Sequence, residues 1–334
     1  MWVQMVKPTV ISTFAGCGGS SLGYQMAGFH ELLAVEWDQN AVDTFRLNFP
    51  GVPVYHGDIA KLTGAECMKL AGIKKGALDV LDGSPPCQGF STAGKRKFDD
   101  PRNSLFKEYA RLLNELQPKV FVMENVTGMV KGCMKQAYLT IIKTLRDCGY
   151  KAKGEVMNAM YFNVPQSRER VIIIGVREDL GIEPSHPKPQ GKPISIKSAI
   201  GKDGFIQYRH SYSKGKVSLA KSSFDKPCLT VTKSGLGWKV FYDTKGNFTK
   251  KQYQVDDVMP TITKGNTYHL KIGETKESAT LFKIDDLKVL ASFPSDFKMT
   301  GNFNDQWARI GNSVPPNLMK AIAEHIKINI LEKI

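Results

Sequence analysis

The sequence has no long hydrophobic run: no stretch approaches the ~20 consecutive apolar residues that a membrane-spanning helix needs. The segment from Met1 to Pro8 also lacks the charged start, apolar core and small-residue cleavage site of a secretion signal. These two absences predict a cytoplasmic protein without a membrane partner.

Cysteine and histidine are scarce, with six of each in the chain. No CxxC pair and no His-rich segment accompanies the cysteines, so the sequence predicts neither a metal site nor a disulfide framework. Free cysteines of this kind are usually small buried residues. The six are Cys17, Cys67, Cys87, Cys133, Cys148 and Cys228.

The chain does have a core-forming composition and an uneven distribution of charge. Its 334 residues, 42% hydrophobic and 10% aromatic, suffice for one large globular domain with an appendage or for two domains. The formal net charge is +14, and the stretch from Lys188 to Thr280 holds +10 of it, with 17 Lys and Arg against 7 Asp and Glu. A concentrated basic region is typical of a surface that binds nucleic acid. Composition alone leaves a solvated lysine-rich face equally open.

The first half of the chain alternates short β-type runs with amphipathic helical patterns. This alternation predicts an α/β fold, with a doubly wound, mostly parallel sheet covered by helices on both faces. Val171–Val176, an apolar β-branched run, is expected as a central strand of the same sheet. Strands are predicted at residues 9–14, 31–36, 52–56, 78–81 and 120–123, and helices at about 22–27, 40–47, 104–116 and 136–147.

The pattern changes after Arg177. Four prolines between Pro184 and Pro193 break regular structure and mark a boundary. The stretch that follows, to about residue 280, is rich in Lys, Gly, Ser, Thr and Tyr with short β-prone runs, so a smaller, irregular β-rich domain is expected. Helical patterns return at about Asp285, and a last helix is predicted from about Pro316 to Glu332.

A Gly-rich turn, Phe14-Ala-Gly-Cys-Gly-Gly-Ser-Ser-Leu-Gly23, follows the first predicted strand directly. Glycine lets a ligand approach the backbone, and the N-terminus of the next helix offers free amides. The spacing differs from the GxGxxG of dinucleotide-binding proteins, which disfavours a nicotinamide-dependent oxidoreductase. Taken alone, the turn fits a plain tight connection about as well.

Acidic residues end the second and third predicted strands. Glu36 could accept the two hydroxyls of a ribose, and Trp37 could stack on a purine. The alternative is a surface acid beside a buried Trp. Asp58 could accept a hydrogen bond from an adenine amino group, and a turn or helix-capping role is the alternative.

Two reactive side chains end the next two strands. Pro85 and Pro86 fix φ at about −65° and lack an amide donor, so Cys87 is expected on an inflexible loop. Glu124 ends the following strand, and a thiol near a carboxylate suggests covalent chemistry assisted by an acid. We place Gln166–Arg170 at the same edge, where open α/β sheets bind ligands.

Seven matching segments occur in order along the chain: FAGCGG at 14–19, Glu36-Trp37, Gly57-Asp58, PPCQGFS at 85–91, Glu124-Asn-Val126, QSRER at 166–170 and GNSVPPNL at 311–318. Together they resemble the C5-cytosine-specific DNA methyltransferase family, of the prokaryotic or phage type, over about residues 9 to 177 and 287 to 330. The resemblance implies the S-adenosylmethionine-dependent methyltransferase fold, S-adenosylmethionine as methyl donor and S-adenosylhomocysteine as product. It implies a catalytic and cofactor-binding domain at 1–184, a target-recognition domain at 185–280, and a return to the catalytic domain with a C-terminal helix at 281–334.

The resemblance also assigns catalytic roles. The thiolate of Cys87 would attack C6 of cytosine, because C5 is a poor nucleophile until the aromaticity of the ring is interrupted. Glu124 would protonate or hydrogen-bond N3 and the exocyclic amine, and Arg170 would bond to O2. Arg168 is expected in the same group, since a nearby Arg favours the thiolate over the thiol.

Binding residues carry over in the same way. The target base must leave the duplex to reach such a site, and a loop after the nucleophile is expected to close over it. An exposed basic loop without a particular role is the alternative for each lysine. The substrate DNA contacts are expected at Gln88, Ser91, Lys95, Arg96 and Lys97. The cofactor contacts are expected at Phe14, Ala15, Gly16, Gly18, Gly19, Glu36, Trp37, Asp58, Ile59, Pro86, Leu105, Asn312, Ser313 and Val314.

The segment at 311–317 has a structural alternative that is compatible with the cofactor role: a Ser-capped helix with Pro in its first turn. One departure from the family concerns residues 280–287, which lack the usual Arg and carry Asp286 where Glu is common. The departure puts in doubt how the recognition domain is anchored.

The partners expected are duplex DNA and a companion restriction endonuclease, and the enzyme is expected to act as a monomer. An RNA (tRNA) cytosine-C5 methyltransferase and a catalytically silent DNA-binding relative remain the rival interpretations.

Overall fold

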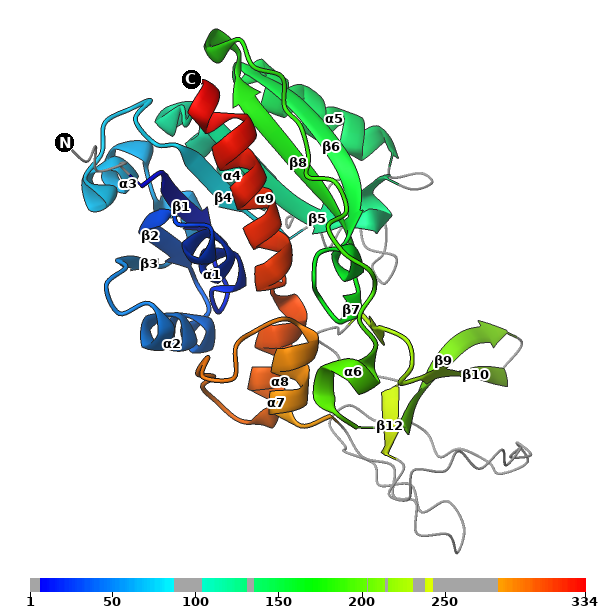
Figure 1. Ribbon diagram of the computed structural model, residues 1–334. Helices are drawn as coiled ribbons and strands as arrows, with labels where there is room; N and C mark the ends of the chain where they lie inside the picture. The colour runs from blue at the N-terminus through cyan, green and yellow to red at the C-terminus, as the bar shows by residue number, and fades with distance from the viewer. Residues whose placement is uncertain are drawn as a thin grey trace, which may run out of the picture.

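The computed structural model describes residues 7–86, 104–130, 135–202, 204–213, 216–230, 238–242 and 282–334. The strands of its main sheet are β1 (Thr9–Thr13), β2 (His30–Glu36), β3 (Val54–His56), β4 (Val80–Gly83), β5 (Val120–Val126), β6 (Tyr150–Asn158) and β8 (Glu169–Arg177). Within the described residues they form one seven-stranded sheet in the order β3-β2-β1-β4-β5-β8-β6 (Figure 1). Strands β1 to β5 run parallel, whereas β8 is antiparallel to both of its neighbours.

Helices cover both faces of this sheet, because successive side chains of a strand point to opposite sides. Odd-numbered strand residues such as Ile11 and Phe121 pack with one set of helices, and even-numbered ones such as Val10 and Val122 with the other. The first set is α3 (Gly64–Ala71), α4 (Ser104–Leu116) and α5 (Lys135–Asp147). The second set is α1 (Gly19–Met26) and α9 (Pro316–Asn329). The result is a doubly wound α/β fold.

The C-terminal part of the chain returns to the N-terminal strands. In Figure 1, α9 lies beside α1. A side chain at Gly23 would place Cβ 2.6 Å from Cβ of Met319, so glycine is what permits this close approach. A third core cluster joins α2 (Gln39–Asn48) to α7 (Ile284–Leu290) and α8 (Phe303–Asn312) through side chains that include Phe45, Phe49 and Leu290.

A smaller β-structure lies beside the main sheet. Its described strands are β9 (Gly204–Ser213), β10 (Lys216–Ser223) and β12 (Trp238–Tyr242), which form an antiparallel sheet in the order β10-β9-β12. The two-residue strand β11 (Cys228–Leu229) pairs instead with β7 (Gln166–Ser167), directly before β8. The recognition region expected from the resemblance is therefore hydrogen-bonded to the QSRER segment of the large domain.

Two contacts join this region to the C-terminal helices. The rings of Phe224 and Phe282 stack with centroids 5.9 Å apart, beside the short helix α6 (Ile196–Ile200). Lys202 Nζ lies 2.6 and 2.8 Å from the two carboxylate oxygens of Asp286. Asp286, the residue at which the sequence departs from the family pattern, thus holds a cation from the start of the recognition region.

The predicted α/β fold is confirmed, and the predicted strands and helices of the first half have counterparts within a few residues. One expectation needs correction: the strand at 171–176 is an interior strand, but it runs antiparallel and lies next to the edge strand β6. Sequence analysis also did not predict β6, α3 or α8.

Among the described residues, Cys17, Cys67 and Cys228 are buried and Cys148 is half-buried, as expected for free cysteines. None of the helices in this part of the chain combines the length and hydrophobicity that a bilayer crossing requires.

Candidate active site

The carboxyl ends of the parallel strands meet at one edge of the main sheet, and the predicted site segments follow them. The Gly-rich turn follows β1, Glu36 closes β2, Asp58 follows β3, and the pair Pro85-Pro86 follows β4. Because β8 is antiparallel, its first residues lie at this same edge, where Arg170 is paired in register with Val126 at the end of β5. The segments that were expected to converge do so.

Glu124 and Arg170 form an ion pair at this edge. Arg170 Nε lies 2.8 Å from Glu124 Oε1, and the two side chains are 14% and 11% exposed. Arg168 is buried, and this burial together with the charge of Arg170 lowers the pKa of its guanidinium to about 9, while the charge of Glu124 acts in the opposite direction. Arg168 therefore still carries its charge at neutral pH. One carboxylate and two cations stand together where β5 ends and β8 begins.

Asn125 ties the ends of β4 and β5 together. Its Nδ2 donates to the carbonyl of Pro85 across 3.0 Å, and its Oδ1 accepts from the amide of Val126. Pro85 is buried and Pro86 exposed, and Pro86 is the last described residue before the candidate nucleophile. Sequence analysis assigned no role to Asn125, although its place beside Glu124 was a signal. The candidates Cys87, Gln88, Ser91, Lys95, Arg96 and Lys97 lie outside the described residues.

The Gly-rich turn leaves space beside its backbone. Gly16 has φ +58°, and a Cβ built there would meet no atom within 4 Å. Gly18, with φ +96°, packs against Phe49, and a Cβ on Gly19 would lie 2.4 Å from the carbonyl oxygen of Val314. Gly18 and Gly19 are thus required by packing, whereas Gly16 faces open space that a ligand can occupy.

Glu36 organises the turn through its carboxylate. Oε2 accepts from the amide of Gly16 at 2.8 Å, and Oε1 accepts from the amides of Trp37 and Asp38 at 2.8 and 2.9 Å. A carboxylate offers about four acceptor positions, so one remains on Oε2 for a ligand hydroxyl. The alternative of a surface acid beside a buried Trp is wrong for Trp37. Its side chain is 78% exposed and available for stacking.

The remaining predicted cofactor positions differ in accessibility. Asp58 is exposed, and its Oδ1 caps the short turn Ile59–Lys61 by accepting from the amide of Ala60, which leaves Oδ2 available. Ile59 and Val314 are buried, and Asn312 is exposed. Phe14, Ala15, Leu105 and Ser313 are half-buried.

The structural alternative for this segment is right about a proline, Pro316, in the first turn of α9, and wrong about the cap, because Ser313 does not cap the helix. The N-cap position of α9 is Pro315, without a side-chain cap. Ser313 Oγ instead donates to the carbonyl of Arg309 at 2.7 Å and lies 3.0 Å from Sγ of Cys17 in the Gly-rich turn. The C-terminal segment therefore contacts the turn directly.

Two buried carboxyl groups lie on the strands that flank β1, Glu31 on β2 and Asp82 on β4. Burial raises the pKa of Asp82 to about 8 and that of Glu31 to about 7. Ser21 Oγ donates to Glu31 at 2.9 Å, and Tyr24 OH lies 3.3 Å from Asp82 Oδ1. Sequence analysis missed this pair, because an acid inside an apolar strand carries no pattern of its own.

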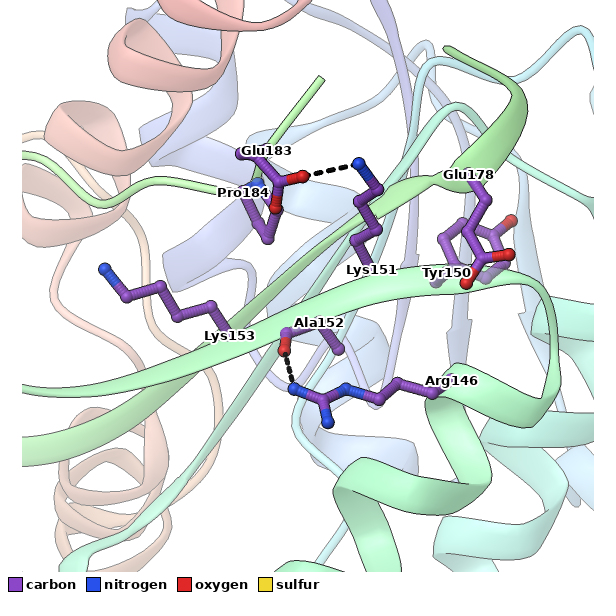
Figure 2. A pocket seen from close by; sticks show the side chains of 8 residues that line it. All are labelled: Arg146, Tyr150, Lys151, Ala152, Lys153, Glu178, Glu183 and Pro184. Carbon is purple, nitrogen blue, oxygen red and sulfur yellow. Dashed lines mark hydrogen bonds and ion pairs between the residues drawn. The ribbon is translucent and has the colours of Figure 1, made fainter. Parts of the chain in front are cut away.

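A cavity of about 430 Å³ lies elsewhere, along the first half of β6 (Figure 2). Tyr150, Lys151 and Lys153 line it with Arg146 and residues of the segment 178–184, and Lys151 forms an ion pair with Glu183. Since β6 runs parallel to β5 and begins at the amino edge of the sheet, this cavity is remote from the predicted site.

Residues 8–328 match the family model of the C-5 cytosine-specific DNA methylases. The chain is 35% identical to the type II methyltransferase M1.HphI of Haemophilus parahaemolyticus, over 99% of this chain and 90% of that protein. It is 32% identical to the type II methyltransferase M.NgoPII of Neisseria gonorrhoeae, over 95% of each.

Solved structures share the fold. EhMeth of Entamoeba histolytica superposes with a TM-score of 0.65 at 16% identity, covering 96% of this chain and 98% of that one. A DNMT2 variant from Spodoptera frugiperda gives a TM-score of 0.64 at 20% identity, covering 96% and 99%. With the sequence matches and the carboxyl-edge site, these results lead to one assignment: the chain belongs to the C-5 cytosine-specific DNA methylase family, enzymes that transfer a methyl group from S-adenosylmethionine to C5 of cytosine in DNA.

Proposed function

We propose that this enzyme methylates a flipped-out cytosine within a specific duplex DNA sequence, through a transient bond between Cys87 and C6 of the base. The observation that carries the proposal is the Glu124–Arg170 ion pair at the end of β5. The next residue, Asn125, donates a hydrogen bond to the carbonyl of Pro85 in the loop that leads to Cys87. An acid, a cation and the loop that leads to a thiol therefore share one edge of the sheet.

The chemistry follows from these groups. The thiolate of Cys87 adds to C6, and Glu124 in its protonated form donates a proton or hydrogen bond at N3, so that electron density moves to C5. Arg170 bonds to O2 of the ring, and Arg168 adds positive charge that favours a thiolate. Transfer of the methyl group to C5 leaves S-adenosylhomocysteine. A base then accepts the C5 proton, Cys87 is eliminated as the thiolate, and the proton at N3 returns to Glu124, which restores the aromatic ring and the free enzyme.

The cofactor pocket proposed here is the edge formed by β1, β2 and β3. S-adenosylmethionine supplies the electrophilic methyl group of its sulfonium. The open space beside Gly16, the remaining acceptor position on Glu36 and the exposed indole of Trp37 fit its amino-acid, ribose and adenine parts. Asp58 would accept from the adenine amino group through Oδ2. The other proposed contacts are Phe14, Ala15, Gly18, Gly19, Ile59, Pro86, Leu105, Asn312, Ser313 and Val314.

The DNA is proposed to lie between the catalytic edge and a target-recognition domain at 185–280, with the catalytic domain at 1–184 and 281–334. The net +10 between Lys188 and Thr280 supports this placement, since phosphate contacts dominate DNA affinity. Gln88, Ser91, Lys95, Arg96 and Lys97 would contact the strand around the flipped base. A companion endonuclease of a restriction-modification system is proposed as a partner in the cell, because the relatives are named type II methyltransferases.

The test uses DNA with 5-fluorocytosine at the target base, found first by sequencing methylated cytosines in cells that express the enzyme. With S-adenosylmethionine, the wild-type enzyme is expected to form a covalent complex that survives denaturation, because fluorine blocks the final elimination. Cys87→Ser is expected to form none and to lose methyl transfer while it still binds the duplex. Cys148→Ser, a half-buried thiol remote from the edge, is the matched control and should react like the wild type.

An adduct with Cys87→Ser, or methyl transfer to tRNA in place of duplex DNA, would contradict the proposal. Absence of any adduct with the wild-type enzyme would instead favour a silent DNA-binding relative.

A further inference from the structure

Helix α8 contacts two loops of the proposed cofactor pocket, the Gly-rich turn after β1 and the Glu36-Trp37 loop after β2. The helix lies about 270 residues later in the chain than these loops. Arg309, in its last turn, forms two parallel contacts with Asp38: Nη1 lies 3.0 Å from Oδ1, and Nη2 lies 3.3 Å from Oδ2. The two side chains are 13% and 39% exposed. A bidentate pair of this kind fixes the direction as well as the distance of the carboxylate, more than a single contact would.

Asp38 is the residue that begins α2 and ends the Glu36-Trp37 loop. Its Oδ1 also accepts from the amide of Ala41 at 2.9 Å and so caps the helix. Its own amide donates to Glu36 Oε1. The position of Asp38 therefore sets the position of the backbone on which Glu36 and Trp37 stand.

The contacts close into a ring. Glu36 holds the amide of Gly16, the next residue Cys17 lies 3.0 Å from Ser313 Oγ, and Ser313 Oγ donates to the carbonyl of Arg309. Cys17 takes part as a neutral thiol, since burial raises its pKa to about 11. The ring joins the turn after β1, the loop after β2 and the end of α8.

The charges make Arg309 the decisive member of this ring. Glu36 and Asp38 are two carboxylates only two residues apart, and the charges of Glu36 and Arg309 both act on Cys17 between them. A neutral side chain in place of Arg309 would leave Asp38 without its bidentate partner.

We propose that Arg309 is a positioning residue for cofactor binding: by holding Asp38 it keeps the Glu36-Trp37 loop and the Gly-rich turn in the geometry that receives S-adenosylmethionine. The inference rests on the cofactor pocket proposed above and extends it to a residue that does not touch the ligand. Arg309 precedes the Gly311–Leu318 segment, so sequence analysis did not include it.

The test measures the Kd of S-adenosylhomocysteine by calorimetry, and KM for S-adenosylmethionine and kcat in steady state. Arg309→Gln is expected to raise both Kd and KM about ten-fold, within the coupling typical of directly contacting residues, and to leave kcat within about two-fold. Asp38→Asn keeps a good helix cap and removes only the charge, so it should act like Arg309→Gln. The double variant should be no worse than either single one.

Arg309→Lys separates charge from geometry. It keeps the cation but loses the planar fork, so the Kd should fall between those of the wild type and Arg309→Gln. Arg177→Gln is the matched control: it removes another Arg–Asp pair, with Nε 2.7 Å from Asp179, at the opposite edge of the sheet. It is expected to lower the melting temperature without changing the Kd.

Wild-type affinity in Arg309→Gln and Asp38→Asn would overturn the inference, as would an equal loss of affinity in Arg177→Gln. Two further variants separate this failure from failure of the pocket itself. If Gly16→Val and Trp37→Ala lose affinity while Arg309→Gln does not, the pocket stands and the role of Arg309 is wrong. If all of them bind like the wild type, the proposed pocket is wrong and the inference fails with it.

Discussion

At the scale of single residues, the fold holds acids on neighbouring strands in contrasting surroundings. Glu124 on β5 has the cation of Arg170 at 2.8 Å, near the edge of the sheet. Asp82 on the adjacent strand β4 is enclosed by Tyr24, Tyr109 and Ser20, and the nearby Glu31 adds to the rise in its pKa. Glu124 is the acid that we propose for the chemistry, whereas burial raises the pKa of Asp82 to about 8.

Glu124→Gln is expected to lower kcat by about 10²- to 10⁴-fold, the usual contribution of a positioned acid, because the amide cannot give a proton to N3. Binding of S-adenosylhomocysteine should not change, since Glu124 lies outside the β1–β3 edge. Single-turnover methylation of duplex DNA measures the first quantity and calorimetry the second. Glu108→Gln on α4 is the control, and an unchanged rate in Glu124→Gln would refute the acid role.

The buried acids predict a pH-dependent stability. The folded chain keeps a proton on Asp82 that the unfolded chain releases, so this contribution is fully present below about pH 4 and is lost as the pH rises through about 8. Between these values the free energy of unfolding falls by up to about 1.4 kcal/mol per pH unit from this group. Glu31 adds a similar loss up to about pH 7.

Asp82→Asn removes the titration and keeps an acceptor for Tyr24. Urea unfolding at pH 6, 7 and 8 should therefore give a shallower decline for the variant than for the wild type, and a more stable variant at pH 8. Parallel declines would show that Asp82 keeps an ordinary pKa in the folded state.

At the scale of elements, the direction of β8 decides whether the site exists. A segment that leads into a parallel strand would lie at the amino edge, remote from Glu124. The antiparallel course of β8 brings Arg170 opposite Val126, and β6 continues the sheet beside it. Sequence analysis placed Gln166–Arg170 at this edge, but the apolar run at 171–176 does not encode strand direction.

The elements that sequence analysis missed have weak patterns for physical reasons. Strand β6 has the sequence Tyr150-Lys-Ala-Lys-Gly-Glu-Val-Met-Asn158. Its apolar pattern is weak because an edge strand exposes its charged residues to water and carries few apolar ones. Helix α8 begins with a capping box between Asn302 and Asp305, which was a readable start signal. Its contacts with Asp38 and Cys17 depend on the return of the chain and are not encoded locally.

The hydrogen bond from Asn125 to Pro85 links the end of β5 to the loop after β4, and a substitution can test this link. Asn125→Ala removes the donor that holds the carbonyl of Pro85, so the loop to Cys87 would lose its attachment to β5. A misplacement of about 1 Å can cost about 10²-fold in rate, and we expect a loss of kcat of that order with unchanged cofactor affinity. Asn114→Ala, on the exposed side of α4, provides the comparison. A wild-type rate in Asn125→Ala would mean that the loop is positioned without this bond.

At the scale of the whole molecule, the C-terminal helices α7, α8 and α9 contact two separate regions of the fold. α8 and α9 contact the cofactor edge through Arg309, Ser313 and the close packing against Gly23. α7 contacts the recognition region through the Lys202–Asp286 pair and the cluster around Phe282. The C-terminal helices thus contact the proposed cofactor loops on one side and the base of the proposed recognition region on the other.

The charge of that recognition region makes a prediction for the whole enzyme. A chain that places a surplus of +10 between Lys188 and Thr280 against DNA should release many counterions on binding. Affinity for the duplex is therefore expected to fall by about 10³-fold or more between 50 and 200 mM salt, as proteins with about 6 to 10 phosphate contacts do. Fluorescence anisotropy of a labelled duplex measures this slope. S-adenosylhomocysteine, a zwitterion, should bind with nearly the same Kd at both salt concentrations.

A single lysine locates the effect. Lys226 is exposed beside β11, at the base of the recognition region. If this lysine contacts a phosphate, Lys226→Gln should reduce the logarithmic salt slope by about one. Lys69→Gln, on the exposed side of α3 and outside the recognition region, removes the same charge and should leave the slope unchanged. Because both variants alter net charge equally, a difference between them reports contact and not bulk charge. A flat slope for the wild-type enzyme, or equal effects of the two variants, would remove the reason for placing the duplex against residues 185–280.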